Sequence, residues 1–301
     1  MEHATDLPFS NLADELHLAL LQSVPDGMCF IDLGGAVRFW NDAAEQISGF
    51  SIAEAVCAAY AGDVYSLNSA DGEPIGLIAF ADLTPEWTQP HSAFLRHKDG
   101  HHLPVAIRVV PVSTGSGEPF GVLHLFSSLA DPSEECLSQI PEEIRSGQLP
   151  VSGSITEQLD HALRAARQGG RPAAIFLIHI DDFENMRRRL GPEASDKLLL
   201  LVDKTTSNCL HPGDSMTRLS DGVLLVILTP TVKRDAAVLA RQICRLVESA
   251  RMEWWGNREQ ITITVGTTML NGHDSPATAL SRAEDCVQRG MAAGGNRVVM
   301  A

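Results

Sequence analysis

The chain has 301 residues, 44% hydrophobic and 20% charged, which is typical of a globular protein with room for two domains. Its formal net charge of −15 argues against nucleic acid as a partner, because phosphates would be repelled. The one basic run, Arg187–Arg189, lies on a predicted helix and is interpreted as a solvated face. No apolar run approaches the roughly 20 residues that cross a bilayer, and no signal-peptide pattern opens the chain. We therefore expect a cytoplasmic protein without membrane insertion.

The cysteines form no C-x-x-C pair and are scattered along the chain. This spacing favours reduced thiols that pack as small hydrophobic residues. The six positions are Cys29, Cys57, Cys136, Cys209, Cys244 and Cys286.

In chain order, apolar residues at helical spacing predict a helix over 10–24, stopped by Pro25-Asp-Gly27. Strand-like segments 28–32 and 36–40 follow, and Asn41 is placed to cap the next helix. Further strands are predicted at 91–97, 103–112 and 120–125, separated by turn signals.

These stretches, in this order, resemble a PAS domain. The matching motifs are Asp26-Gly-Met-Cys-Phe-Ile-Asp, Phe39-Trp-Asn-Asp-Ala-Ala-Glu and Arg96-His-Lys-Asp-Gly. The resemblance implies a five-stranded antiparallel sheet over 25–130, preceded by the helix within 1–24, that serves as a sensor and homodimerisation module. Trp40 and Asn41 stand at the ligand cleft of that fold, and Trp40 either faces the cleft or fills the core.

Four histidines of this half could suggest haem. They fall on or beside strand hairpins, whereas haem-binding PAS proteins usually carry the axial ligand on a helix, so we do not expect haem. A flavin adduct would need an Asn-Cys-Arg-Phe segment, which does not occur. The sequence leaves any PAS ligand unidentified. The histidines are His91, His97, His101 and His102.

Residues 131–153 are expected to be a linker. Pro132, Pro141 and Pro150 argue against one unbroken helix that would transmit a twist between two domains.

The second half alternates helix and strand. Helices are predicted at 156–168, 182–210 with an interruption at Gly191-Pro192, 235–252 and 277–293. Strands are predicted at 173–180, 260–265 and 297–300, and a hairpin over 215–228 turns at Asp221-Gly222. Trp254-Trp255 is expected to cap a helix against the core, with a partner anchor as the alternative.

This order, with the Asp181-Asp-Phe-Glu segment and the hairpin, resembles the GGDEF domain of diguanylate cyclases, which join two GTP molecules into cyclic di-GMP. The resemblance implies an α+β, nucleotidyl-cyclase-like βααββαβ domain over 154–301. The residues at the family's signature positions indicate a degenerate member.

Two metal positions carry this interpretation. The reaction needs a divalent cation, and Mg²⁺ prefers carboxylate oxygens. The resemblance implies one carboxylate at the position of His179 and one at the position of Gly222, and neither residue supplies one. Asp181 fills a second acidic position, which is not a ligand in the family pattern. A one-residue slip that places Asp221 at the metal position is the alternative; it would turn Leu224 and Val226 outward.

Nucleotide contacts are altered as well. By the same resemblance, Arg187 replaces a guanine-reading Asn, Met291 a phosphate-binding Lys and Gly295 an Arg. Ser220 and Asp221 replace two glycines that admit the nucleotide. Possible nucleotide-binding remnants are Asp196 and, at the product-inhibition site, the span His211 to Asp214.

A zinc site built from His179, Asp181, Asp182 and His211 is not expected, because their spacing matches no compact ligand pattern. A histidine that ends a buried strand is instead interpreted as a satisfied core residue.

The sequence thus predicts a non-catalytic signalling protein with no catalytic residues and no metal. A PAS sensor or dimerisation module precedes an inactive GGDEF domain that regulates a protein partner in cyclic di-GMP signalling. The alternatives are an unorthodox active cyclase and a switch that binds GTP or cyclic di-GMP without turnover.

Overall fold

The computed structural model describes residues 18–301 except 59–60, 77, 80–82, 115–116, 130–158, 161, 165–172, 212, 229–234, 256 and 272. The predicted linker 131–153 and Cys136 lie outside the described residues, as does most of the helix predicted over 10–24. The described chain forms two compact units, one mainly before and one mainly after Leu129. None of its described helices is both long and apolar enough to span a bilayer.

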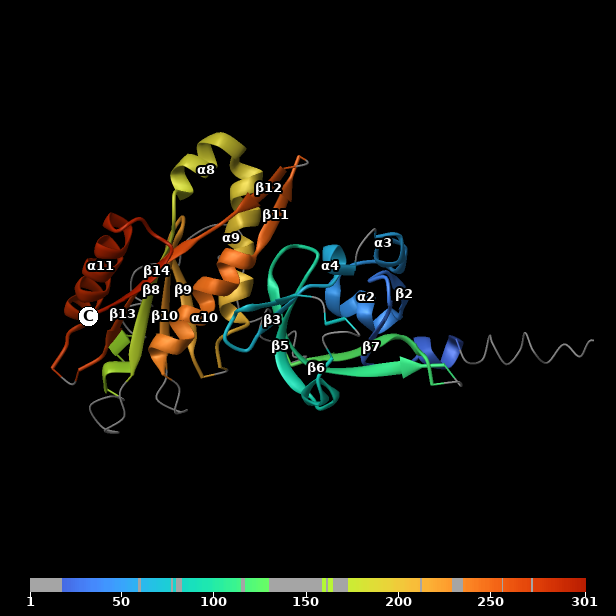
Figure 1. Ribbon diagram of the computed structural model, residues 1–301. Helices are drawn as coiled ribbons and strands as arrows, with labels where there is room; N and C mark the ends of the chain where they lie inside the picture. Colours follow the sequence, from blue (N-terminus) through green and yellow to red (C-terminus); the bar gives the residue numbers. More distant parts are fainter. Residues whose placement is uncertain are drawn as a thin grey trace, which may run out of the picture. The chain divides into compact units, whose positions relative to one another are not determined.

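The N-terminal unit is built on one sheet with the strand order β2-β1-β7-β6-β5-β3-β4 (Figure 1). The central pairs β1–β2, β1–β7 and β6–β7 are antiparallel. The predicted five-stranded antiparallel core is confirmed. Two three-residue strands that sequence periodicity did not reveal, β3 and β4, extend it at one edge. The elements are β1 (Gly27–Asp32), β2 (Val37–Trp40), α2 (Asp42–Ser48), α3 (Ile52–Cys57), α4 (Ala61–Val64), β3 (Leu67–Ser69), β4 (Pro74–Gly76), η2 (Pro85–Thr88), β5 (His91–Arg96), β6 (His102–Ser113) and β7 (Pro119–Ser128).

Short helices of this unit begin at side-chain caps. The Asn41 side chain accepts from the Ala44 backbone N–H at the start of α2. Ser51 and Glu54 form a capping box at the start of α3. Such caps satisfy backbone donors that the first helical turn leaves without partners.

The C-terminal unit has a five-stranded sheet in the order β14-β13-β8-β10-β9 (Figure 1). The β13–β14 pair is parallel, and β8 lies antiparallel between β10 and β13. Helix α11 covers one face, where Ala283 and Val287 pack with Leu177 and Leu225. Helix α10 packs against β13 and β14, with α9 beside it. The elements are β8 (Ala174–Ile180), α8 (Phe183–Leu190), α9 (Pro192–Ser207), β9 (Ser215–Ser220), β10 (Val223–Leu228), α10 (Ala236–Ser249), β11 (Arg251–Trp254), β12 (Asn257–Gln260), β13 (Ile263–Met269), α11 (Pro276–Ala292) and β14 (Arg297–Met300).

The predicted order of this unit is confirmed, including the helix break at Gly191. One element was not predicted: β11 and β12 form a separate two-stranded hairpin. The helix predicted over 235–252 therefore ends at Ser249, and the strand predicted from 260 begins at Ile263.

The described cysteines are free thiols. Cys29, Cys209, Cys244 and Cys286 are buried as predicted, whereas Cys57 is exposed. Burial raises the pKa of the Cys244 thiol to about 12, so this residue stays protonated and behaves as a small apolar side chain.

Candidate functional site

The end of β8 and the turn of the β9–β10 hairpin lie side by side and form the candidate site. His179 is opposite Val223 of β10 and Thr264 of β13. The Ile180 backbone N–H donates to the Gly222 carbonyl at 2.8 Å. This bond places the two positions that the resemblance assigns to metal ligands next to each other, at the end of β8 and in the hairpin turn.

Gly222 has backbone and packing requirements of its own. Its φ is 78°, in the left-handed region, and the β9–β10 register shifts between Val223 and Leu224. That combination is typical of a hairpin closed by a glycine bulge. A Cβ at this position would lie 3.0 Å from Cγ of Phe183, the first residue of α8. A side chain at position 222 would therefore meet both backbone strain and a steric contact.

His179 is half-buried, and its Nδ1 has no hydrogen-bond partner among the described protein atoms. The expectation of a satisfied core histidine is wrong at this atom. Neither residue that opposes it across the sheet, Val223 or Thr264, hydrogen-bonds to Nδ1; the Thr264 hydroxyl donates to Asp181 instead.

Asp181 is the residue that engages that hydroxyl. Its carboxylate accepts from Thr262 Oγ1 at 2.8 Å, from Thr264 Oγ1 at 2.6 Å and from the Asn296 backbone N–H at 2.8 Å. The Asp181 backbone N–H also donates to the Thr262 carbonyl. The carboxylate thus ties the end of β8 to β13 and to the chain entering β14.

Arg187 and Asp221, two of the altered signature positions, contact each other. Arg187 Nη1 lies 2.5 Å from Asp221 Oδ2, although the two residues are 34 positions apart in the chain. Both side chains are about half exposed, at 46% and 53%. Because exposed pairs of this kind contribute little stability, at most about 1 kcal/mol, the pair matters mainly for where it places the two groups.

The other two arginines of helix α8, Arg188 and Arg189, also have hydrogen-bonded partners. Arg188 donates to Asn185, and Arg189 makes two bonds to Glu259 at 3.0 and 2.6 Å. The bonds to Glu259 raise the pKa of Arg189. The Arg187–Arg189 run is exposed, as predicted. Sequence spacing alone does not reveal that Arg187 and Arg189 form ion pairs with carboxylates from other elements.

The slip that would place Asp221 at the metal position finds no support in the side-chain geometry. The Asp221 carboxylate is turned to Arg187. Our sequence argument against the slip was wrong in one respect, because β10 is buried on both faces: Leu224, Leu225 and Val226 are each no more than 2% exposed. Burial alternation therefore cannot set the register of this strand.

The predicted nucleotide-binding remnants are dispersed over the unit. Asp196 is exposed on α9. Asp214 and His211 close a local turn, in which the Asp214 carboxylate accepts from the His211 backbone N–H at 2.9 Å. Of the altered signature positions, Met291 is 38% exposed on α11. A Cβ at Gly295, just before β14, would lie 3.0 Å from the Asp181 carboxylate, a tight contact at a backbone φ of 74°.

In the N-terminal unit, Trp40 and Asn41 serve the core. Trp40 is 1% exposed, and its indole N–H donates to the Phe50 carbonyl at 3.2 Å. Asn41 is fully buried; its oxygen accepts from Met28 and Ala44 backbone N–H groups, and its NH₂ donates to the Asp26 carbonyl. The structure favours core filling over a ligand-facing role for both.

Sequence reasoning missed a buried polar pair in the same core. His124 is fully buried on β7, with one ring nitrogen 3.2 Å from the Tyr65 hydroxyl and the other 3.0 Å from the Ile78 carbonyl. Burial lowers the pKa of His124 to about 4, so the ring is neutral at pH 7. Strand alternation would place residue 124 inward, but its partners are distant in sequence.

The Trp254-Trp255 pair lies in the β11–β12 hairpin. Trp255 is 88% exposed at the turn, whereas the Trp254 ring lies 5.0 Å from the Lys197 ammonium of α9. The prediction that the pair caps a helix is wrong for Trp255. Trp254 contacts α9 through a cation–π interaction.

A group of three potential metal ligands occurs once among the described residues, and it is not the set that the sequence analysis considered and rejected. His179, Asp181, Asp182 and His211 do not form such a group there. His97, Asp99 and His101 do.

Comparison with known proteins gives two matches within the chain. Residues 147–297, half of the chain, match the family described as diguanylate cyclase, GGDEF domain, and residues 16–127 match the PAS fold. The probable diguanylate cyclase DgcE of Escherichia coli (strain K12) is 22% identical over 275 residues, covering 90% of this chain and 25% of DgcE. The response regulator PleD of Caulobacter vibrioides is 29% identical over 148 residues, covering 48% of this chain and 33% of PleD.

Among solved structures, the coiled coil and GGDEF domain of DgcB from Caulobacter crescentus, in complex with c-di-GMP, is similar over 56% of this chain and 93% of that one. The sequence identity is 20% and the TM-score 0.46. This chain spans only a quarter to a third of the length of DgcE and PleD.

Proposed function

Since this chain belongs to the GGDEF family of diguanylate cyclase domains, preceded by a PAS fold, we propose that it acts in cyclic di-GMP signalling without synthesising the dinucleotide. DgcE is similar to this chain over nearly its whole length, and PleD is similar over about half of it. The proposed role of the C-terminal unit is regulation of a protein partner.

One observation carries the proposal: the two positions where the family places metal-binding carboxylates are His179 and Gly222. These residues lie at adjoining places, linked through the Ile180–Gly222 backbone bond. Glycine offers no side-chain oxygen, and imidazole is a poor ligand for Mg²⁺, which prefers hard carboxylate oxygens. Without the cation, neither triphosphate charge nor the attacking hydroxyl would be stabilised.

The neighbouring contacts support the same conclusion. The Arg187–Asp221 ion pair joins the position of a guanine-reading Asn to that of a small glycine. An added carboxylate at position 221 would repel phosphate. Asp181, the acidic residue nearest the lost ligand, holds three hydrogen bonds with the protein itself and would have to exchange them to bind a cation.

A turnover assay tests the absence of catalysis. The purified full chain is incubated with GTP and either Mg²⁺ or Mn²⁺, and the products are separated by chromatography, with an active GGDEF protein as the positive control. We expect no dinucleotide. Cation-dependent formation of cyclic di-GMP by the full chain would overturn the proposal in favour of an unorthodox cyclase.

Calorimetry separates the proposal from a nucleotide-binding switch. Titration with GTP and with cyclic di-GMP should give no heat of binding. A clear isotherm that disappears in Asp196→Ala or in Asp214→Ala would instead identify a retained nucleotide site without turnover.

The N-terminal unit is proposed to be the homodimerisation module. Analytical ultracentrifugation of the full chain should give the mass of a dimer. A monomer at all concentrations would exclude this part of the proposal without affecting the argument about catalysis.

A further inference from the structure

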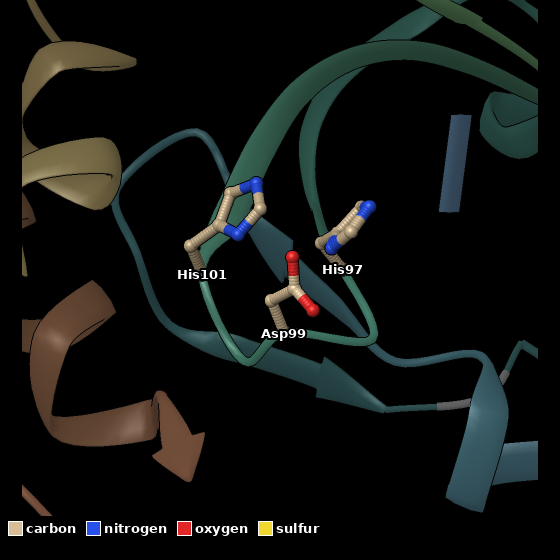
Figure 2. Close-up of side chains that lie close together, drawn as sticks. All are labelled: His97, Asp99 and His101. Atoms are coloured by element: carbon tan, nitrogen blue, oxygen red, sulfur yellow. The ribbon is translucent and has the colours of Figure 1, made fainter. Parts of the chain in front are cut away.

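Three side chains with metal-binding atoms gather at the turn between β5 and β6. His97, Asp99 and His101 each offer one such atom, and the three atoms lie within 4.8 Å of one another. Figure 2 shows the Asp99 carboxylate pointing up between the two imidazole rings. All three residues belong to a five-residue segment that joins adjacent elements of the N-terminal sheet.

The hairpin and its contacts with α2 hold this turn in place. The Lys98 backbone N–H donates to the Ser48 carbonyl at 2.8 Å, which fixes the turn to the end of α2. The His97 ring lies over Gly49, where a Cβ would be 2.5 Å from Nε2. Figure 2 shows that this turn brings the side chains of His97, Asp99 and His101 together.

The lysine of the turn, Lys98, pairs with a carboxylate other than Asp99. Lys98 Nζ lies 2.5 Å from Glu54 Oε1 on α3. That contact lowers the pKa of the Glu54 carboxyl to about 2, consistent with a charged pair at neutral pH. The ammonium of Lys98 is therefore engaged by a different carboxylate.

The donor set selects a class of cation. Two imidazoles with one carboxylate suit borderline transition metals such as Zn²⁺, Co²⁺ and Ni²⁺, whereas Mg²⁺ and Ca²⁺ prefer oxygen ligands throughout. Tetrahedral Zn²⁺, with bonds of about 2.0–2.2 Å, needs donor atoms roughly 3.4 Å apart. The observed atoms lie within 4.8 Å of one another, so binding would require side-chain rotations that bring them closer.

We propose that His97, Asp99 and His101 form a divalent transition-metal site, with Zn²⁺ as its typical occupant. The site is independent of the proposed loss of cyclase activity. It would make the β5–β6 turn a metal-responsive part of the PAS fold.

Metal binding by the full chain, freed of any affinity tag, tests the site. Zn²⁺ is titrated against a chromophoric chelator, and Co²⁺ is added separately to record its visible spectrum. We expect one equivalent of Zn²⁺ with an affinity in the micromolar range or tighter. The Co²⁺ spectrum should show ligand-field bands without a thiolate charge-transfer band.

Variants locate the site. His97→Gln and Asp99→Ala should each weaken Zn²⁺ binding at least tenfold. Asp99 is exposed, so its replacement leaves the core intact, whereas His101 is buried and its variant could fail to fold. The matched control is His91→Gln, at the far end of β5, where the ring stacks on Trp87 and contacts the Gln89 carbonyl. It should bind Zn²⁺ like the parent.

Several outcomes would overturn the proposal. They are no Zn²⁺ binding at millimolar metal, unchanged affinity in Asp99→Ala, or loss of binding in the His91 control. A thiolate band with Co²⁺ would also overturn it, since it would assign the metal to a cysteine such as the exposed Cys57.

Discussion

Asp181 and His179, two residues apart on the same strand end, differ in how the surrounding protein satisfies them. Asp181 receives three hydrogen bonds, two from hydroxyls and one from a backbone N–H. His179 Nδ1 receives none from the described protein atoms. The carboxylate that persists in the site therefore has a structural explanation, while the imidazole at the family's metal position has none.

Asp181→Ala should destabilise the C-terminal unit by roughly 2–4 kcal/mol, because hydrogen bonds to a charged acceptor contribute about 1.5–3 kcal/mol and their donors would be left without partners. Urea unfolding measures the change. Glu284→Ala, at an exposed residue within α11, is the control and should change stability by less than about 1 kcal/mol. Equal effects of the two substitutions would show that the Asp181 bonds contribute little.

His124 makes the stability of the N-terminal unit depend on pH. Its folded-state pKa of about 4 lies below its ordinary value of 6.5, because burial disfavours the charged ring. As the pH falls, the unfolded chain binds the proton first. The stabilisation due to neutral His124 is therefore complete above about pH 6.5 and is lost progressively down to about pH 4.

The expected loss between those limits is about 3 kcal/mol, from 1.36 kcal/mol per pKa unit. Urea unfolding between pH 7 and pH 4.5 measures it, with Trp40 fluorescence as the probe in a background where Trp87, Trp254 and Trp255 are replaced by Phe. In His124→Gln the part of the pH dependence of stability that is due to His124 should disappear. A variant with the same pH dependence as its parent would assign the slope to other groups.

At the scale of elements, the β9–β10 hairpin shows why this site differs from the signature turn that the GGDEF resemblance implies. Gly222 combines a left-handed φ of 78° with a close approach to Phe183. The hairpin therefore favours glycine at the position that the GGDEF resemblance assigns to a metal ligand. A side chain there would strain the backbone and press on Phe183.

Gly222→Ala should destabilise the C-terminal unit by about 1–3 kcal/mol, through left-handed strain of about 1–2 kcal/mol and the contact with Phe183. Gly117→Ala is the control for backbone strain, because Gly117 has a φ of 84° and no atom within 4 Å of an added Cβ; its effect is measured on the N-terminal unit. The difference in unfolding free energy between the two variants estimates the Phe183 contact. A smaller loss at 222 than at 117 would contradict this account.

At the scale of the whole molecule, each unit has its own buried core. Trp40, Tyr65 and Phe126 lie in the first, while Phe176 and Ile178 are fully buried in the second. Three prolines in the predicted linker argue against a continuous helix between them. We expect the two cores to unfold as separate cooperative units.

Core truncations test this independence. Trp40→Ala should lower the stability of the N-terminal unit by about 3–5 kcal/mol and leave the unfolding of the C-terminal unit unchanged. Phe176→Ala should have the reverse effect. Native-state hydrogen exchange resolves the two, with amides of β7 and β8 as reporters. Loss of protection in both units from either single variant would show that they fold cooperatively.

Local patterns were sufficient for much of this protein. Strand alternation, the Asp221-Gly222 turn signal and caps such as Asn41 act over a few residues, so the order of the longer elements in both units could be predicted from them. The β11–β12 hairpin was not predicted, because β11 follows almost directly on α10 and the composition of the chain does not change there. The absence of side-chain carboxylates at positions 179 and 222 was likewise visible in the sequence.

The contacts that give these residues their roles needed the folded chain. Arg187 meets Asp221, Asp181 meets Thr262 and Thr264, and His124 meets Tyr65 across separations that periodicity does not encode. His97, Asp99 and His101 are close in sequence, yet whether their ligand atoms converge depends on how the turn is held against α2. The periodicity of side chains along a helix or strand predicts which face a residue occupies. Packing between elements distant in sequence decides which atoms its side chain contacts.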